Sequence, residues 1–231
     1  MPNLFPWLPP ALQDLMIDAA WETITMVFVS VLVAVAIGLP LALLLYSTGQ
    51  GGLRPNGWIN RPLGLLINAV RSTPFIILMV AIVPFTRLVA GTSIGTAAAI
   101  VPLALASTAF ISRLFEGALR EVDRGVIEAA RAMGATPMQI VRKVLIPEAM
   151  PGIILGLTLA VVSLIGYSAM VGAVGGEGLG DLGIRYGYQR FMPEVMLAVV
   201  VILIVLVQAV QSLGEWIASR FDKRAPRNRG R

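Results

Sequence analysis

The sequence predicts an all-α polytopic membrane protein with five transmembrane helices, in a single domain that covers residues 1–231. Of the 231 residues, 57% are hydrophobic and only 13% are charged, and the mean hydropathy is +0.82. A soluble domain of this size needs a larger share of polar residues. Apolar stretches long enough for a hydrocarbon core of about 30 Å recur at 24–46, 62–84, 94–111, 152–173 and 195–218.

The Lys and Arg residues of the connections predict how these spans are oriented. Alternate connections carry fifteen of them on one side of the membrane and three on the other, and none precedes the first span. The side rich in Lys and Arg is expected to be cytoplasmic. The N-terminus is then outside, and the cytoplasmic parts are a long loop at 112–150 and a basic tail at 219–231. Because an inside tail lies near anionic lipid, the net charge of +5 indicates topology and no nucleic-acid partner.

The chain contains no Cys and no His. Thiol nucleophiles, disulfides, His-based acid–base chemistry and most transition-metal sites are therefore excluded. The two lysines, Lys143 and Lys223, do not follow the glycine pattern of a nucleotide-binding P-loop. We expect no catalytic site, no metal and no cofactor in this chain, so energy from a nucleotide has to come from another subunit.

Three of the predicted spans carry features that disturb a helix. Pro40 and Pro102 are expected to kink the helices that contain them. Arg71 lies about nine residues into the second apolar stretch, a costly position unless it faces a wet cavity or finds a partner. The alternative, slightly favoured, is a helix break at 71–73 before Pro74, which leaves Arg71 near the cytoplasmic interface.

The fourth span carries small and polar residues at helical spacing. Gly152 and Gly156 form a pair that permits close helix contact, and Ser163, Tyr167 and Met170 continue on about the same face. Such a stripe suits either a helix interface, which is the more common case, or the lining of a pathway. Ser163, Tyr167 and Met170 are the pathway candidates.

The connection after the fourth span is rich in glycine, and Gly178–Gly183 matches the G-x-G-x-x-G spacing of dinucleotide-binding sites. We reject that match because the fingerprint works only between a strand and a helix, whereas this segment lies between two membrane spans. Glycines in such a loop permit tight re-entrant turns or a contact surface for another protein.

Residues 124–145 predict a rigid elbow of two short helices. The first carries a charged and an apolar stripe at helical spacing: Arg124, Glu128 and Arg131, and Val126, Ala130 and Met133. Glu128 and Arg131 are close enough to pair. Gly134 is expected to end this helix, and Thr136–Gln139 is expected to begin the next with a capping box and Pro137 at its first position.

The second helix of the elbow is expected to end at Pro147, before the fourth span. A rigid protrusion suits docking to another protein, and an amphipathic helix also suits passive binding to the lipid surface. These residue patterns favour neither alternative over the other.

The elbow also resembles a family signature. Glu128-Ala129-Ala130, the following Gly134 and the pair Ile146-Pro147 are similar to the EAA loop of ABC-importer membrane subunits. This resemblance implies the type I ABC importer permease fold, in which a coupling helix inserts into a cytoplasmic ATPase. It implies that the ATPase-coupling residues are Glu128, Ala129, Ala130, Arg131, Gly134, Ala135 and Pro137.

Within that family, the stretches RSTPFIILM, RAMGATPMQIVRKVLIPEAMPG and GLGDLGIRYGYQRF resemble the methionine-importer permeases, and the similarity covers nearly the whole chain. Glu177 departs from this pattern, since a small residue is expected there. The resemblance implies import of methionine, as the L-form with the D-form as a further option, across the bacterial cytoplasmic (inner) membrane. It also implies that Met170 is a gate residue.

The same resemblance implies three kinds of protein partner: a second copy of the chain in a homodimer, two ABC ATPase subunits that bind ATP and Mg, and an extracytoplasmic methionine-binding protein. Two alternatives stay open. One is the same machine with another small amino acid or organic ion as cargo, and the other is an ATP-independent channel or carrier. Secondary carriers often use intramembrane carboxylates, and only Glu215, near the end of the fifth span, comes close.

Overall fold

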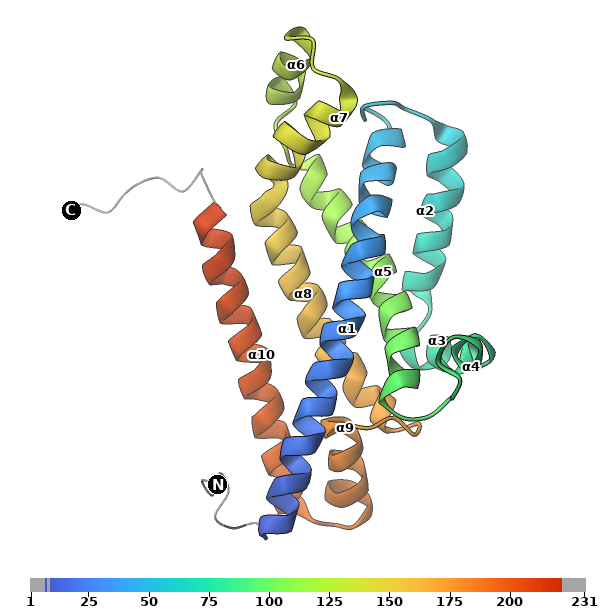
Figure 1. The fold of residues 1–231 in the computed structure, drawn as a ribbon, viewed down its shortest axis with the longest axis vertical. Helices are drawn as coiled ribbons and strands as arrows, with labels where there is room; N and C mark the ends of the chain where they lie inside the picture. The colour runs from blue at the N-terminus through green and yellow to red at the C-terminus, as the bar shows by residue number, and fades with distance from the viewer. Residues whose placement is uncertain (1–6, 8, 222–231) are drawn as a thin grey trace, which may run out of the picture.

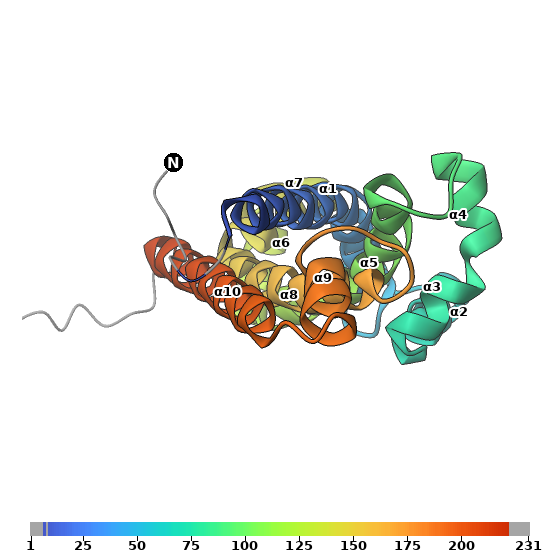
Figure 2. The same ribbon diagram turned by 90° about the horizontal axis from the view of Figure 1, so that it is seen from below.

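The computed structural model describes residue 7 and residues 9–221, and that part of the chain is built from helices without a strand. The α-helices are α1 (Pro10–Thr48), α2 (Gly57–Ser72), α3 (Phe75–Ala81), α4 (Val83–Ala90), α5 (Thr96–Arg120), α6 (Arg124–Ala132), α7 (Pro137–Ile140), α8 (Ile146–Gly172), α9 (Leu179–Leu182) and α10 (Pro193–Phe221); two π-helical segments are η1 (Val141–Leu145) and η2 (Gly183–Gln189). They form an elongated bundle with α10 at one edge and α2, α3 and α4 at the other (Figures 1 and 2). From residue 222 on, the predicted basic tail lies outside the described residues.

Five apolar segments cross the bundle, as predicted. In the described part of the chain, four helices are long and apolar enough to span a membrane: α1, α5, the continuous helix 137–172, and α10. The second predicted span is the broken pair of α2 and α3, which are bent by 105° at the break. The all-α polytopic fold is therefore confirmed, with one of its five spans divided in two.

The first helix begins earlier than its apolar stretch because one face of its first turns is buried. Met16 and Ala19 pack in one cluster with Leu179 of α9, whereas Asp14 and Asp18 on the other side are exposed. A helix can thus continue through charged positions as long as its apolar stripe stays covered. A search for uninterrupted apolar runs does not detect such an extension.

Helix α5 is the centre of the bundle. Its most apolar 18-residue window is 61% buried, compared with 17% for that of α10. Small residues let the neighbouring helices approach it closely: a Cβ on Gly38 of α1 would lie 3.0 Å from Ile111 Cγ2, and one on Gly152 of α8 would lie 2.9 Å from Ala118 Cβ. The close contact predicted for Gly152 is therefore made with α5, and the apolar surface of α10 stays largely uncovered.

The second span breaks where the sequence predicts a break. α2 ends at Ser72, Thr73 is extended with ψ 125°, and α3 begins after Pro74, as the restriction on residues that precede proline requires. Arg71, however, lies at the end of α2 that is farthest from the α1–α2 connection (Figure 1), about 21 Å along the axis at 1.5 Å per residue. If the α1–α2 connection is cytoplasmic, as the Lys and Arg count predicts, Arg71 lies away from that interface, contrary to the prediction.

The prediction that Pro147 ends the second helix of the elbow is also wrong, since one helix continues from residue 137 to residue 172. In η1, the Ile146 N–H donates to the carbonyl of Val141, five residues earlier. Proline has no N–H to donate, and its ring collides with the carbonyl four residues earlier in a regular α-helix. The wider π turn directly before Pro147 relieves both problems, so α7 continues through η1 into α8 without an end.

The glycine-rich connection folds back against the bundle at the end opposite the elbow, where α9 lies beside α1 and α8 (Figure 2). The Gly178 N–H donates to Glu22 Oε2 at 2.8 Å, and the Leu179 N–H donates to Thr23 Oγ1 at 2.9 Å. Side chains of α1 thus cap the first turn of α9. The tight re-entrant turn expected from the glycines is present.

Glu177, the residue that departs from the pattern of similar permeases, joins this connection to α5. Its Oε2 accepts hydrogen bonds from the Thr96 N–H at 3.0 Å and from Thr96 Oγ1 at 2.5 Å, and the Gly95 N–H donates to the Gly175 carbonyl at 3.1 Å. A carboxylate at a helix N-terminus also interacts favourably with the helix dipole. Glu177 therefore fixes the outer loop to the start of the central helix.

Gly180 tests the close contact between α9 and α8. A Cβ there would lie 2.5 Å from Ala169 Cα, whereas a Cβ on Gly166 of the same α8 would meet nothing within 4 Å. We expect Gly180→Ala to lower the free energy of unfolding by about 1–3 kcal/mol, the usual cost of overpacking. Gly166→Ala is expected to leave it unchanged or to raise it slightly. Thermal unfolding of the purified chain in detergent measures both, and equal midpoints for the two variants would contradict the contact.

Candidate functional site: the elbow and the face of α8

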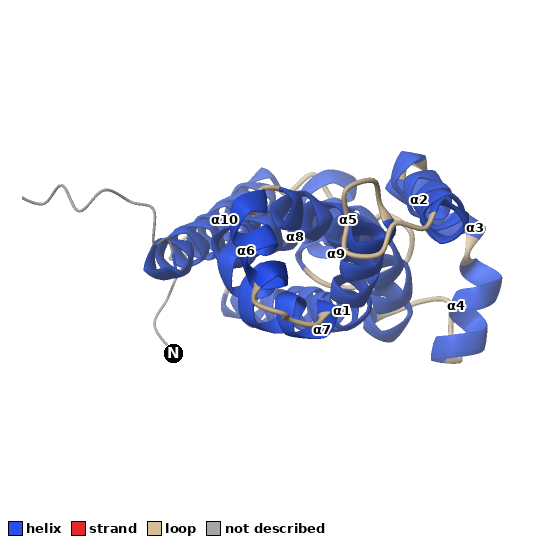
Figure 3. Ribbon diagram, turned by 90° about the horizontal axis from the view of Figure 1, so that it is seen from above, coloured by secondary structure: helices blue, strands red, loops and turns tan. Residues whose placement is uncertain are grey.

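The elbow, residues 124–145, projects from one end of the bundle (Figures 1 and 3). Its first helix ends at a glycine stop: Gly134 has φ +79°, the Ala135 N–H donates to the Ala130 carbonyl at 3.1 Å, and the Gly134 N–H donates to the Arg131 carbonyl at 2.9 Å. These two bonds are the Schellman motif. The predicted end of the first helix is therefore confirmed.

The second helix of the elbow begins with the predicted capping box. The Gln139 N–H donates to Thr136 Oγ1 at 3.4 Å, the Thr136 N–H donates to Gln139 Oε1 at 2.8 Å, and Pro137 takes the first helical position. Helices this short are not stable alone in water. The glycine stop and the capping box together fix the angle between them.

Apolar side chains of the elbow continue the main core of the protein. Ile127 and Ala130 of α6 and Ile140 of α7 are buried in the same cluster as Phe115 of α5 and Ala149 of α8. Protein interiors are close-packed and transmit strain. The elbow therefore shares one packed core with α5 and α8.

The apolar stripe predicted for α6 is only partly correct. Ala130 is buried, but Val126 is 44% and Met133 82% exposed, and Ile127 takes their place in the core. α6 has nine residues and buries only a narrow face, formed by Ile127 and Ala130, which are three positions apart. Val126, Met133 and Met138, which is 65% exposed, are therefore exposed apolar side chains of the elbow, and these three residues are here called the elbow patch.

The residues expected to couple to an ATPase lie within the elbow but have different surroundings. Glu128, Ala129, Arg131 and Gly134 are exposed, Ala135 and Pro137 are half-buried, and Ala130 is buried. The ion pairs of residues 9–221 do not include the expected one between Glu128 and Arg131. Arg131 instead donates to the Gly52 carbonyl at 3.4 Å, which leaves the Glu128 carboxylate facing outward.

Arginines of α5 and α6 surround the glycine-rich turn that follows α1. A Cβ on Gly49 would lie 2.8 Å from Arg120 Nη2, and one on Gly51 would lie 3.3 Å from Arg124 Nη2. Glycine leaves room here for guanidinium groups. The guanidinium groups of Arg120 and Arg124, together with the hydrogen bond from Arg131, connect the elbow to the α1–α2 turn.

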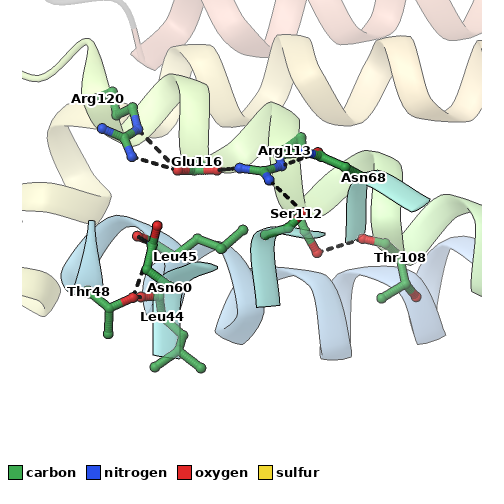
Figure 4. A network of polar contacts seen from close by, with 11 residues as sticks. Leu44, Leu45, Thr48, Asn60, Asn68, Thr108, Ser112, Arg113, Glu116 and Arg120 are labelled. Carbon is green, nitrogen blue, oxygen red and sulfur yellow. Dashed lines mark hydrogen bonds and ion pairs between the residues drawn. The ribbon is translucent and has the colours of Figure 1, made fainter. Parts of the chain in front are cut away.

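One network near the elbow was not expected from the sequence (Figure 4). Glu116 is 5% exposed and accepts hydrogen bonds from Arg113 Nη1 at 2.7 Å and from Arg120 Nε and Nη2 at 3.1 and 2.8 Å. Arg113 also donates to Asn68 Oδ1 at 3.1 Å and to the Gly64 carbonyl at 3.0 Å, so α5 is joined to α2. The sequence signal for this network is the i, i+3, i+7 spacing of Arg113, Glu116 and Arg120 on one helix face. It was missed because these residues were assigned to the loop at 112–150.

The three pathway candidates of α8 do not form one cluster. The Tyr167 ring stacks on the Phe75 ring of α3, with centroids 4.7 Å apart and planes 10° apart. Ser163 Oγ donates to the Leu159 carbonyl of its own helix at 2.9 Å, and Met170 is 48% exposed. Tyr167 therefore packs α8 against the broken span, and Met170 is the candidate that presents its side chain outward.

Comparison with known proteins relates the chain to transport systems. The family model described as "Binding-protein-dependent transport system inner membrane component" matches residues 34–224. The Vibrio cholerae protein named "Probable D-methionine transport system permease protein MetI" is 51% identical over 212 residues, which are 92% of this chain and 94% of that protein. The Escherichia coli K12 protein named "D-methionine transport system permease protein MetI" is 52% identical over 158 residues, 68% of this chain and 73% of that protein.

Solved structures agree with these sequence matches. A chain from a structure described as "Inward facing conformations of the MetNI methionine ABC transporter" superposes with a TM-score of 0.91 at 48% identity, over 93% of this chain and 99% of that one. A chain from the "Crystal structure of an amino acid ABC transporter with histidines" superposes with a TM-score of 0.75 at 24% identity, over 91% and 95% of the two chains. The second likeness shows the fold alone.

The capping box predicts how stable the elbow is. We expect Thr136→Ala to remove one end motif and to make amide hydrogen exchange over residues 124–145 about fivefold faster, since a lost cap costs about 1 kcal/mol. Thr136→Ser retains the hydroxyl and is expected to exchange like the original chain. Hydrogen–deuterium exchange read by mass spectrometry compares the three proteins, and equal rates in all of them would show that the box does not hold the elbow.

Proposed function

Because this chain belongs to the family of inner-membrane components of binding-protein-dependent transport systems, we propose that it forms the translocation pathway of an ATP-driven ABC importer for methionine. The methionine cargo is supported by the relatives named for D-methionine transport, so the cargo includes the D-form as well as the L-form. The observation that carries the proposal is the elbow: it is packed onto the spans at its base and exposes an apolar patch at its outer side.

The elbow couples the membrane helices to an ATPase. Glu128, Ala129 and Arg131 are the exposed polar and small positions, and the elbow patch beside them offers flexible methionine side chains, which adapt to a partner surface. Gly134, Ala135 and Pro137 form the turn that keeps the two helices at a fixed angle, and Ala130 packs the first helix on the core. ATP and Mg are bound by the ATPase, and this chain does no nucleotide chemistry of its own.

The importer contains two copies of the chain, two ATPase subunits and an extracytoplasmic methionine-binding protein. A two-fold arrangement covers apolar surface on both copies with the same contacts, and the broad exposed surfaces of α10 and α2 provide such area. The elbow faces the cytoplasm of a bacterial cell, the N-terminus lies outside, and the C-terminus lies inside. This orientation agrees with the excess of Lys and Arg at the elbow side.

The pathway runs along the face of α8 beside the broken span. Met170 acts as the gate residue, and Tyr167 and Ser163 line the approach to it. Arg71 is exposed at the break, with its guanidinium carbon 6.0 Å from the centre of the Phe110 ring. An arginine this far from the α1–α2 connection persists where it faces water or an anionic group, so its guanidinium is suited to the carboxylate of an amino-acid cargo.

Charge reversal at Glu128 tests the coupling. We expect Glu128→Arg to lower ATP-dependent methionine uptake into vesicles at least about tenfold, because losing a paired interfacial charge costs about 2–5 kcal/mol. Gly134→Pro is expected to have the same effect, since proline requires φ near −65° and Gly134 has φ +79°. Both variants should still insert into the membrane.

The matched control is Glu194→Arg, the same reversal at an exposed position at the start of α10, at the other end of the bundle. Its uptake is expected to stay unchanged. Normal uptake by Glu128→Arg and Gly134→Pro would refute the coupling role of the elbow.

The cargo is tested by competition in the same vesicles, which contain this chain, its ATPase and its binding protein. Uptake of labelled methionine should require ATP and should be blocked by L- and D-methionine but not by other amino acids. ATP-dependent uptake of a different amino acid or organic ion would support an ABC importer but refute methionine as its cargo. Uptake without ATP would indicate a channel or carrier.

A further inference from the structure

A polar cavity of about 510 Å³ lies where α1 ends and α2 begins, beside the elbow end of α5. Its lining includes Asn56, Gly57, Asn60 and Arg61 of the α2 start and Arg120 of α5. This volume is many times the share of about 30 Å³ that one water molecule takes in the liquid. The cavity has no part in the coupling surface or in the pathway described above.

The cavity is lined by cations and lacks a carboxylate within the described part of the chain. Arg61 is exposed and takes part in no ion pair among residues 9–221. Arg120 shares the Glu116 carboxylate with Arg113, so two guanidinium groups are balanced by one buried negative charge. The cavity wall therefore carries an excess of positive charge, which favours an anionic ligand.

The fold holds the residues of the cavity wall in place. Asn60 Nδ2 donates to the Leu45 carbonyl at 2.8 Å and to Thr48 Oγ1 at 3.1 Å, so its amide hydrogens are used within the protein. The Asn56 side chain accepts from the Trp58 N–H at 3.0 Å and caps the start of α2. The arginines are therefore the groups offered to a ligand, and their guanidinium forks match phosphate oxygens.

The outer side of α2 shows where the ligand comes from. Trp58, Arg61 and Leu65 follow at i, i+3, i+7 and share one face, and Trp58 is 93% and Leu65 70% exposed. A tryptophan and an arginine at one end of an apolar helix are typical of the headgroup level of a bilayer, with leucine deeper among acyl chains. This pattern is what is expected if the start of α2, which lines the cavity, lies at the level of the lipid phosphates.

We propose that this cavity binds a phosphate group at the membrane interface, held by Arg61 and Arg120, and that its source is the headgroup of an anionic phospholipid. Bound there, the lipid phosphate balances the positive charge that the single Glu116 carboxylate leaves on Arg113 and Arg120. It also joins the α1–α2 turn to the bilayer surface. The site follows from the cavity and its charges and does not depend on which cargo the chain transports.

The test uses the full-length chain with Trp7, Trp21 and Trp216 replaced by Phe, so that Trp58 is the remaining tryptophan of the four in the sequence. It is reconstituted in dioleoylphosphatidylcholine vesicles that contain dibrominated phosphatidylglycerol or dibrominated phosphatidylcholine. Quenching of Trp58 fluorescence reports the relative affinity for the two lipids. We expect phosphatidylglycerol to be preferred about fivefold, and Arg61→Gln to bring the ratio close to one, as the loss of one interfacial arginine predicts.

Arg220→Gln is the matched control, because Arg220 is another exposed arginine, at the end of α10 and outside the cavity. Its lipid preference should equal that of the unchanged chain. An equal loss in Arg220→Gln and Arg61→Gln would refute the site, because it would show a general effect of charge.

Inorganic phosphate distinguishes the two sources of the ligand. If the lipid is the ligand, the preference for phosphatidylglycerol persists when phosphate replaces chloride at equal ionic strength. The alternative is a site for free phosphate, which three results together would show. Phosphate would raise the unfolding temperature in phosphatidylcholine vesicles, Arg61→Gln would abolish that rise, and no lipid preference would be found. These results would refute the lipid as the source of the ligand. A chain that responds to neither probe would overturn the whole proposal.

Discussion

The constraint on which this structure depends is that a backbone in hydrocarbon has to satisfy its own hydrogen bonds. Pro74 and Pro147 have no N–H to donate to a helix, and the chain adapts to each of them in a different way. Before Pro74 the chain leaves the helix, and α3 continues at 105° to α2. Before Pro147 the helix widens into a π turn and continues into α8. The first solution produces the break beside Arg71, and the second keeps the helix continuous from residue 137 to residue 172.

The ends of the central helix α5 are fixed in place by charged side chains. At the outer end, Glu177 accepts hydrogen bonds from Thr96, and at the elbow end Glu116 is shared by Arg113 and Arg120. The Glu116 carboxylate is buried, and removing it would leave both arginines without their counter-charge, which is destabilising. These contacts make α5 a fixed axis between the outer loop and the elbow. The elbow is thus packed in one core with residues of α1, α5 and α8.

Much of this could be predicted from the sequence because the signals are local. The Gly134 stop, the capping box at Thr136 and the break before Pro74 depend on a few neighbouring residues, and each was found where the pattern placed it. The predictions for Pro147 and for the buried face of α6 were wrong because tertiary contacts decided them. A π turn has no signature that a capping or breaking rule detects, and the choice of Ile127 over Val126 depends on how α6 lies against η1 and α7.

The roles of the arginines also depend on tertiary contacts that the sequence does not show. Counting Lys and Arg by loop indicates topology, but that count treats Arg113, Arg120 and Arg71 as equivalent. In the fold, Arg113 and Arg120 share one buried carboxylate, whereas Arg71 is exposed and lies over an aromatic ring. A paired arginine holds helices together, and an exposed one within a span is placed for a ligand or for water. Since the two kinds cannot be distinguished without the positions of their partners, functional roles for membrane arginines have to be assigned from the packed structure.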